Sequence, residues 1–449
     1  MTIGSRTEVT EKQVTAAWQS LLNTGRKLKT EKGQSLWVIY PGESSDVPGS
    51  DFQDAVIKVD RHLLKGNIEL HVKSSDWHKH EHDRNPIYNS VVLHVALQYD
   101  YEGDIRTQNG AVIPAVTIGR YLENNLAASI VSQVPCAEVA INSPDGLLAI
   151  IDNAGLARFY EKAARFQNYL QRRNAGQTLF SGIMTALGYA RNQEPFRQLA
   201  ERVPLSVLES IVRENNQDES LVFLLGTAGL LPSQRLGIEY SPFEDYAYVD
   251  KLEGVWEGMK RIDVMAYGDW EPFRVRPSNS PLRRIAGMSH LIRRYQVKGL
   301  LGGLVELVRD VPIEKACPHL EEGLMAADDG YWSSRYDFGK GCARLSKWLI
   351  GQSRAADIVI NILLPFVYAW GKDNSQKELA EKTLTIFHAY PAVETNTLER
   401  HMRAQFGLKS TQVNSAQCQQ GLLHLYKKRC TQGRCKECEV VRDKRINKQ

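Results

Sequence analysis

The chain has 449 residues, of which 43% are hydrophobic and 24% charged, and its formal net charge is +4. These ordinary values exclude a disordered, collagen-like or disulfide-scaffold chain and predict about two to four domains. No apolar run reaches the roughly 18–20 residues of a membrane span. The longest, Ile358 to Trp370, is interrupted by Asn361 and Pro365. The polar N-terminus lacks a signal-peptide core, so we expect a cytoplasmic protein with no membrane partner.

The first part of the chain has the periodicities of a mixed α/β domain. Apolar residues recur at helical spacing over 11–26, beginning with Val14, Ala17 and Trp18. Short runs bounded by Gly, Pro and polar residues then predict strands. These strands cover 36–40, 55–59, 67–73 and 91–99, with another near 114–119.

After about residue 153 the pattern becomes helical, with Gly, Pro and Asn between the segments. The predicted helices cover 156–173, 178–190, 195–201, 205–214 and 220–230, and the helical pattern continues over 282–309 and 343–368. We therefore predict an α/β domain at 1–152, a mainly α-helical domain at 153–400 and a Cys-rich basic segment at 401–449.

Histidines are concentrated in the first domain, where six of the eleven lie between His62 and His94. Imidazole and carboxylate groups are the usual ligands of divalent metals, and both types occur here. Glu69 and His71 share one face of a predicted strand, so they are aimed at the same volume. The pattern favours a metal or acid/base site, and a polar loop with surface histidines is the alternative.

A more specific pattern consists of Asp51 just before one strand and Glu69-x-His71 on the next. An acid followed by an acid-x-base pair resembles the core of the PD-(D/E)XK nuclease superfamily, whose element order is helix, three strands, helix, strand. The resemblance implies that Asp51 and Glu69 hold Mg²⁺ or Mn²⁺. The metal would activate water and stabilise charge on the scissile phosphate. Further side chains would line or complete this metal site, namely His78, His80, His82 and Asp83, with Asp54 as a spare ligand.

The sequence departs from the superfamily pattern at two positions. Ser50 stands where the proline would be, and His71 stands where the lysine would be. Lys73 lies two residues further on the same strand face and is a candidate replacement. His71 or Lys73 would therefore orient the attacking water, or His71 would itself be a metal ligand or a base.

A second resemblance covers nearly the whole chain. The string Gly66-Asn-Ile-Glu-Leu-His-Val-Lys-Ser-Ser-Asp-Trp-His-Lys-His-Glu-His-Asp83 is similar to the signature of a bacterial family labelled domain of unknown function 2851. Several later strings follow in the same order, including Arg274-Val-Arg-Pro277, Tyr336-Asp-Phe-Gly339 and Gln420-Gly421-Leu422. This resemblance assigns a family and brings no activity with it.

Arginines gather in the segment 270–294 and are candidates for binding the phosphates of a substrate. Guanidinium groups suit phosphate, and we predict this role for Arg274, Arg276, Arg283 and Arg284. Pairing with acids between domains is the alternative. The nearby aromatics Tyr331, Trp332 and Tyr336 either stack on bases or, more commonly, pack helices together.

The C-terminal end combines cysteines with positive charge. Seven cysteines without an export signal argue against structural disulfides. The spacing Cys430-x4-Cys435-x2-Cys438 is typical of a zinc or iron–sulfur site, and the local Cys418 favours zinc. Some PD-(D/E)XK nucleases hold an iron–sulfur cluster with one distant cysteine, for which Cys136 or Cys342 would be the candidates here. The segment 426–449 carries nine Lys/Arg against three acids, a charge that suits phosphate.

Three functions are compatible with these features. The first is a metal-dependent nuclease that binds nucleic acid through the helical domain and basic tail. The second is a non-catalytic nucleic-acid-binding protein on a nuclease-like fold, and the third is a metal-dependent hydrolase of a small molecule. A serine-nucleophile hydrolase and a nucleotide-driven motor are not supported, because neither G-x-S-x-G nor a phosphate-binding loop ending in Gly-Lys-Ser/Thr occurs.

Overall fold

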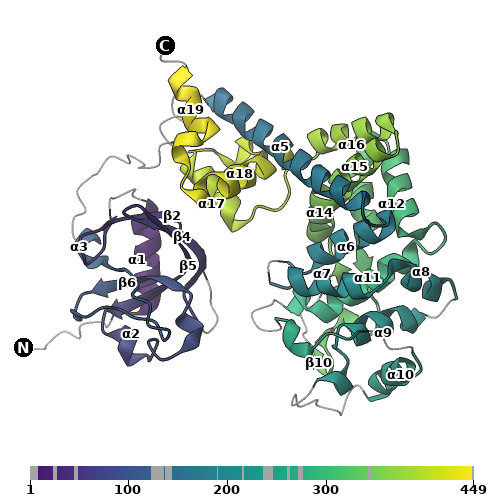
Figure 1. Cartoon of the computed structure of the whole chain (residues 1–449), viewed down its shortest axis with the longest axis horizontal. Coiled ribbons are helices and arrows are strands. Elements are labelled where there is room, and N and C mark those ends of the chain that lie inside the picture. The colour runs from purple at the N-terminus through teal and green to yellow at the C-terminus, as the bar shows by residue number, and fades with distance from the viewer. Residues whose placement is uncertain are drawn as a thin grey trace, which may run out of the picture. The chain divides into compact units, whose positions relative to one another are not determined.

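The computed structural model describes most of the chain, and it divides by contacts into two units. The first unit comprises 1–155, 395–414 and 418–449, and the second comprises 156–394 and 415–417. The residues that the structure describes are 9–23, 28–44, 49–122, 136, 144–189, 191–214, 217–235, 246–259, 263–271, 277–341 and 346–446. Figure 1 shows the elements of both units.

The first unit is built on a mixed sheet of seven strands in the order β1-β2-β4-β5-β6-β7, with β3 paired to β4. The strands β2, β4 and β5 form antiparallel pairs, whereas β6 is parallel to β5 and β7 is parallel to β6. Their bounds are β1 Leu28–Lys29, β2 Ser35–Tyr40, β3 Glu43–Ser44, β4 Phe52–Val59, β5 His62–Lys73, β6 Val91–Gln98 and β7 Ala115–Thr117.

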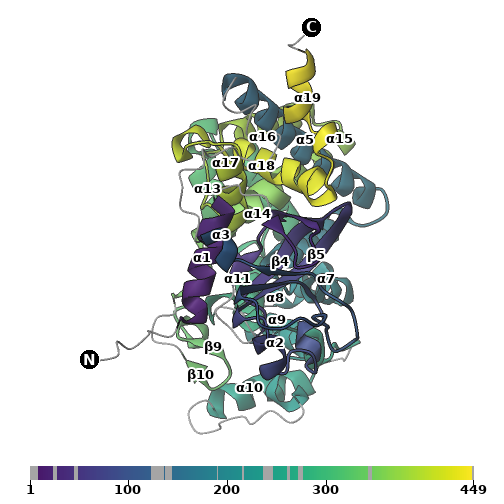
Figure 2. The same cartoon turned by 90° about the vertical axis from the view of Figure 1, so that its left-hand side faces the viewer.

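One face of this sheet is covered by α1 (Glu11–Asn23), which buries Val14, Trp18 and Leu21 against Ile57 and Leu70. The helical spacing of the apolar residues in α1 produces the stripe that fits the sheet. The short α3 (Gly119–Leu122) lies next to α1 (Figure 2). The parallel connection from β5 to β6 passes through α2 (Asp76–Lys79) and the 3₁₀ turn Pro86–Tyr88.

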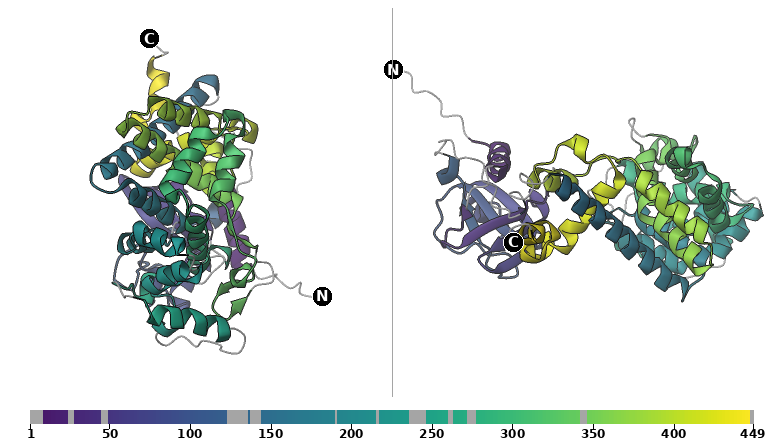
Figure 3. Two further views of the ribbon diagram at one scale, coloured as in Figure 1. Left: turned by 90° about the vertical axis from the view of Figure 1, so that its right-hand side faces the viewer. Right: turned by 90° about the horizontal axis from the view of Figure 1, so that it is seen from above.

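The C-terminal segment, which the sequence marks only as Cys-rich and basic, is folded into helices. It contains α17 (Thr397–Gln405), α18 (Ala416–Lys428) and α19 (Glu439–Ile446). The helix α18 packs closely on the beginning of α5 (Pro144–Leu170), because a Cβ at Gly421 would lie 1.9 Å from the Ile151 carbonyl oxygen. Figure 3 shows these C-terminal helices, in yellow, beside α5. The segment also reaches the sheet, since His401 Nε2 bonds the Ile39 carbonyl at 2.8 Å.

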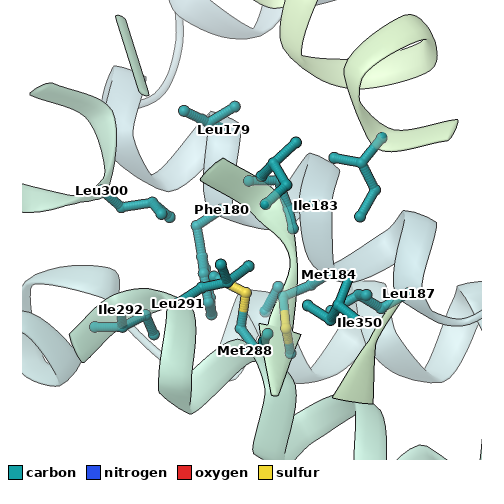
Figure 4. Close-up of a cluster of buried hydrophobic side chains, with 14 of the residues drawn as sticks. Leu179, Phe180, Ile183, Met184, Leu187, Met288, Leu291, Ile292, Leu300 and Ile350 are labelled. Carbon is teal, nitrogen blue, oxygen red and sulfur yellow. The ribbon is translucent and has the colours of Figure 1, made fainter. Parts of the chain in front are cut away.

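The second unit is helical around one large apolar core. Residues of α6, α11 and α12 meet there with Ile350 of β11, as Figure 4 shows for Phe180, Met184 and Leu291. The helices of this unit are α6 Ala175–Leu187, α7 Gln193–Arg202, α8 Leu205–Arg213, α9 Gln217–Thr227, α10 Tyr246–Glu257, α11 Pro281–Arg294, α12 Gly299–Asp310, α13 Ala316–Leu324, α14 Gln352–Ile358, α15 Leu364–Asp373 and α16 Lys377–Ala389. Short strands occur at β8 Ala326–Ala327, β9 Arg335–Asp337, β10 Lys340–Gly341 and β11 Trp348–Ile350.

The helical stretch Gln352–Asp373 is long and apolar enough to cross a membrane, with a mean hydropathy of 1.3. It comprises α14, a π-helical turn at Val359–Leu363 and α15. Within its most apolar 18-residue window, 67% is buried inside the protein, as in a core helix. The expected interruption at Asn361 and Pro365 coincides with the π-helical turn and the first turn of α15.

Candidate metal and acid/base site

Two carboxylates face each other where β4 begins beside β5. The Asp51 backbone N–H donates to Glu69 Oε2 at 3.2 Å, and the Leu70 N–H donates to Asp51 Oδ2 at 2.8 Å. The antiparallel register brings them together, because Phe52, the residue after Asp51, pairs with Ile68. The two acids of the sequence pattern therefore lie side by side.

Imidazoles complete the site around Glu69. His82 Nε2 lies 3.3 Å from Glu69 Oε1, and His71 Nε2 lies 4.0 Å from the same oxygen. Among the residues that the structure describes, His71, His80 and His82 form the one group of three metal-ligating side chains whose ligand atoms all lie within 4.8 Å of one another. Three imidazoles thus gather here, and the Glu69 carboxylate lies within 4.0 Å of two of them. Imidazole with carboxylate is the donor set of a borderline transition metal.

A fourth histidine holds the ring of His71 in place. His71 Nδ1 lies 2.9 Å from His94 Nε2, so the two rings share one hydrogen bond. His94 lies on β6, where the parallel register places it opposite Glu69. With its Nδ1 engaged, His71 presents Nε2 to the site, as a metal-ligating histidine does when its other nitrogen is fixed.

The site is buried on the sheet side and open at one ligand. Glu69, His71 and His82 are 6%, 1% and 7% exposed, whereas the His80 side chain is 42% exposed. Burial, followed by the charge of Glu69, raises the pKa of Asp51 to about 7. Burial likewise raises the pKa of Glu69 to about 8. Loss of hydration is the largest cause of both shifts, because it disfavours the charged carboxylate.

The histidines shift in the opposite direction for the same reason. Burial, followed by the nearby His94, lowers the pKa of His71 to about 2, and burial lowers the pKa of His94 to about 3. The neutral imidazole is the form that binds a metal. In the described part of the chain, His82 Nδ1 and His94 Nδ1 are buried and have no hydrogen-bond partner. The neutral imidazoles and the buried carboxylate of Glu69 together fit a divalent cation.

Aromatic packing and hydrogen bonds hold the loop that carries His80 and His82 in place. Trp77 is fully buried and donates from Nε1 to the Arg106 carbonyl at 2.9 Å. The His82 ring stacks on Tyr88 with centroids 3.7 Å apart. At the start of the loop, Ser74 Oγ donates to Asp100 Oδ1 at 3.0 Å. The aromatic packing and the hydrogen bond of Ser74 together fix the His82 ring, which faces Glu69.

Some predicted ligands lie outside the group. His78 Nδ1 pairs with Asp83 Oδ2 at 2.9 Å, so these two side chains bind each other. Lys73 is exposed at the end of β5, and its charge contributes to lowering the pKa of Asp100, after hydrogen bonds from Ser75 and Ser74. Asp54 has a left-handed backbone (φ 58°) at a bulge in β4, and its charge acts on Tyr40 instead of on the site.

Sequence reasoning missed two residues of this environment. His94 was visible as a histidine in an apolar strand, but its place beside His71 depends on the parallel register of β5 and β6. Glu11, the first residue of α1, lies with Oε1 3.9 Å from His80 Nδ1. No local signal links position 11 to position 80, so only the packing of α1 on the sheet could reveal that contact.

Comparison with known proteins adds the family. A family described as "Protein of unknown function (DUF2851)" matches residues 11–397, which is most of the chain. The chain belongs to this family. The DUF2851 match includes the whole histidine site and ends before most of the C-terminal segment. Neither the curated proteins nor the solved structures provide a match to the chain.

In the helical unit of this DUF2851 protein, two of the predicted phosphate ligands are structural residues. Arg283 is fully buried and donates to the main-chain carbonyls of Trp332, Arg335, Ser346 and Trp348. Arg284 is 4% exposed and donates to the Leu349 carbonyl, to Tyr189 Oη and to Asn279 Oδ1. Our prediction of accessible phosphate contacts is therefore corrected for this pair. Arg274 and Arg276 lie outside the described residues.

The aromatics near this segment also serve packing. Trp332 is buried, and the Tyr331 ring stacks on Tyr248 with centroids 4.0 Å apart. Trp332 and Phe338 pack edge to face at 5.3 Å. The commoner of our two interpretations, helix packing, accounts for Tyr331 and Trp332, and base stacking does not.

Cys418 shares an apolar cluster with Cys430 and Cys438, but within the described residues no three cysteine sulfurs lie within 4.8 Å of one another. Cys418 is buried in α18, and burial followed by the charges of Asp152 and Glu399 raises the pKa of its thiol to about 12. The charged groups that act on the Cys418 thiol are thus carboxylates. The other three cysteines lie in the turns Cys430–Gln432 and Cys435–Glu437 and at Cys438, just before α19. Cys342, one candidate for a distant ligand, lies outside the described residues.

Proposed function

We propose that this protein is a metal-dependent phosphodiesterase acting on nucleic acid, with its active centre at Glu69 and the surrounding histidines. The observation that carries the proposal is a group of three imidazoles, His71, His80 and His82, beside the buried carboxylate of Glu69 and the half-buried carboxylate of Asp51. Such a donor set serves a divalent cation in hydrolysis.

The arrangement of strands also supports a nuclease-like core. The order α1, β2, β4, β5, α2, β6 follows helix, three strands, helix, strand, with antiparallel pairing up to β5 and parallel pairing of β5 with β6. The helix between β5 and β6 is reduced to the four residues of α2. The PD-(D/E)XK resemblance thus rests on topology as well as on the position of the two acids.

Each side chain of the proposed site has its own role. Glu69, His71, His80 and His82 would hold the metal, and Asp51 supports Glu69 through the paired backbone contacts. A bound divalent cation lowers the pKa of water and offsets negative charge on the phosphate. Three imidazoles favour Mn²⁺ over Mg²⁺, which prefers an all-oxygen shell. The exposed His80 marks the solvent side from which substrate would approach.

Cleavage assays on labelled DNA and RNA, in single- and double-stranded form with Mn²⁺ or Mg²⁺, test this proposal. We expect Glu69→Gln and Asp51→Asn to lower cleavage by about 10²-fold or more while leaving nucleic-acid binding intact, because they remove metal support and not substrate contacts. Asp54→Asn is the matched control: it removes an acid three residues away, and asparagine tolerates the left-handed backbone there. Absence of cleavage by the wild type with either metal would refute the proposal.

The second candidate is a non-catalytic nucleic-acid-binding protein. It is supported by the residue that stands where the nuclease superfamily has its lysine. His71 stands there with its Nδ1 tied to His94, and Lys73 is exposed at the end of β5. In that case the same assays would give salt-sensitive binding without cleavage by any variant.

A further inference from the structure

The part of α5 that belongs to the second unit carries a line of positive charge. Between 156 and 174 the chain has five Lys/Arg and one acid, Glu161. Four of the cations and one tyrosine follow one another at steps of four, three, four and three residues, namely Arg158, Lys162, Arg165, Tyr169 and Arg172. Residues at these steps lie on one side of a helix, and we call this line the α5 stripe. Arg172 stands just beyond the end of α5, where the Gln171 N–H still makes a helical hydrogen bond.

Side-chain interactions agree with this placement. Burial, followed by the charge of Arg165, lowers the pKa of Arg158, so these two cations act on each other although seven positions separate them. At the end of the helix, the Arg173 guanidinium lies 5.8 Å from the centroid of the Tyr169 ring and 3.5 Å from Glu201. The helix C-terminus, which favours cations, accounts for arginines in its last turn but not for Arg158 and Arg165.

The charge of the α5 stripe is largely left uncompensated. Arg165 and Arg172 are exposed, and among the residues that the structure describes neither forms an ion pair with an acid. Lys162 donates to Asn361 Oδ1 in the π-helical turn, and because this partner is a neutral amide, the positive charge remains. The stripe therefore presents cations that an anionic partner could bind.

Other surface arginines of the same unit are paired within the protein. On α7, Arg197 Nε donates to Glu194 Oε2 at 2.8 Å, and its Nη1 lies 2.7 Å from Glu201 Oε1. On α8, Arg213 Nη2 lies 3.9 Å from Glu209 Oε2. These helices place an acid beside each of the two cations, which α5 does not do for Arg165 or Arg172.

The length of the stripe points to a polyanion. From Arg158 to Arg172 the helical rise of 1.5 Å per residue gives about 21 Å. Phosphates along one strand of a nucleic acid recur at a rise of about 3.4 Å, so the stripe spans roughly six nucleotides. A single small anion would contact one or two of the cations, whereas a strand would contact the whole line.

Tyr169 indicates a strand with unpaired bases. Its side chain is 49% exposed, and it stands between Arg165 and Arg172. An aromatic ring within a line of cations stacks on an unpaired base, whereas the bases of a duplex are already stacked on one another. An anionic membrane fits less well, because the large apolar side chains that α5 exposes are Tyr160 and Tyr169. Helices that lie on membranes expose a whole face of residues such as Leu and Phe.

We propose that the α5 stripe binds a single-stranded segment of nucleic acid, with its cations on successive phosphates and Tyr169 stacked on a base. This inference rests on the proposed function for the class of partner, and it narrows the substrate to a strand with unpaired bases. Binding at the stripe needs no metal, so it is measured separately from cleavage.

Fluorescence anisotropy of the full-length protein tests the proposal, with a chelator present so that metal-dependent cleavage cannot occur. The probes are labelled DNA and RNA of about 20 nucleotides, as single strands and as duplexes, and we expect the single strands to bind more tightly. The double variant Arg165→Gln/Arg172→Gln should weaken single-strand binding about 10-fold at moderate salt. It should also lower the slope of log affinity against log salt by about 1.4, because two phosphate contacts are lost. The matched control Arg197→Gln/Arg213→Gln removes two paired arginines and should change neither quantity.

A second pair of variants separates stacking from charge. Tyr169→Ala should weaken single-strand binding about 5-fold or more and leave the salt slope unchanged, because it removes a ring and no charge. Tyr169→Phe keeps the ring and should bind as the wild type does. Circular dichroism of each variant verifies that it is folded.

Three results would overturn the proposal. Affinity for single strands that is equal in Arg165→Gln/Arg172→Gln and the wild type would exclude the stripe as the binding surface, and cleavage by the wild type would still support the proposed function. Tighter binding of duplexes that Tyr169→Ala does not affect would exclude the single strand. Binding to phosphatidylserine vesicles through the stripe, without binding of nucleic acid, would assign it to a membrane instead. Stripe-dependent binding of single strands without cleavage would uphold this proposal and refute only the catalytic one.

Discussion

Two regions of the protein bury ionisable side chains in opposite ways. In the helical unit Arg283 has its terminal N–H donors directed at main-chain carbonyls, so this side chain links Trp332 and Arg335 to Ser346 and Trp348. Around Glu69, carboxyl groups and imidazoles face one another. Burial raises the pKa of the carboxyl groups and lowers that of His71, so the neutral form of each group is favoured. Burial of a charged residue therefore indicates function only when its polar atoms converge on a shared point instead of on the backbone.

The largest effect should come from removing the buried arginine. We expect Arg283→Met to lower the free energy of unfolding by about 3–5 kcal/mol, because several buried carbonyls lose their donor. Arg293→Met, on an exposed position of the same helix α11, should change it by less than about 0.5 kcal/mol. Urea unfolding measures the free energy of unfolding of both variants and of Glu69→Gln, and so tests whether the two regions differ. An equal cost for Arg283→Met and Glu69→Gln would contradict it.

The second largest effect is expected on Mn²⁺ affinity when the support of the His71 ring is removed. His94 fixes the His71 ring through one hydrogen bond, so His94→Leu should weaken Mn²⁺ binding by about 10–100-fold. His94→Gln, which keeps a hydrogen-bonding group, should weaken it less. Isothermal titration calorimetry measures both, with His62→Leu on an exposed position of β5 as the control. Unchanged affinity in His94→Leu would show that His71 needs no support.

A third expectation follows from the carboxyl pKa values of about 7 and about 8 in Asp51 and Glu69. Both exceed their unfolded values, so the folded chain holds these protons more tightly, and stability is lost as pH rises through the folded pKa values. The lowered pKa values of His71 and His94 act mainly below pH 6.5, where they make stability rise with pH. Above that point only the carboxyls matter.

Between pH 6.5 and 8 we therefore expect the metal-free protein to lose about 1–2 kcal/mol of stability. Glu69→Gln should flatten this decline. Urea unfolding at several pH values in the presence of a chelator makes the measurement. A wild type whose stability is constant or rises across this interval would mean that the two carboxyl groups are not buried together.

The smallest effect should come from Lys73. Because this side chain is exposed at the end of β5, Lys73→Ala should change stability by less than about 0.5 kcal/mol and leave Mn²⁺ affinity unchanged. Thermal unfolding and metal titration test both points. A loss of cleavage comparable to that of Glu69→Gln would instead restore Lys73 as the residue that orients water.

Much of the local structure was accessible from the sequence. Alternation of apolar residues predicted the strands near β2, β4, β5 and β6, and helical spacing predicted α1 and the helices from α6 to α9. The acid pair and the histidine-rich loop were identified because ligand-type residues were dense within about thirty positions. The region 343–368 was only partly predicted: it contains β11 before its helices, since a short apolar strand and a buried helix have similar composition.

The sequence by itself determined which elements form and which residue types are available for chemistry, because both depend on neighbours along the chain. The tertiary structure decided which of those residues meet. The β5–β6 register brought His94 to His71, the packing of α1 brought Glu11 to His80, and the apolar cluster gathered Cys136 with the C-terminal cysteines. It also directed Arg283 inward, away from any phosphate. Contacts between distant positions depend on register and packing, which leave no signal within any single stretch of sequence.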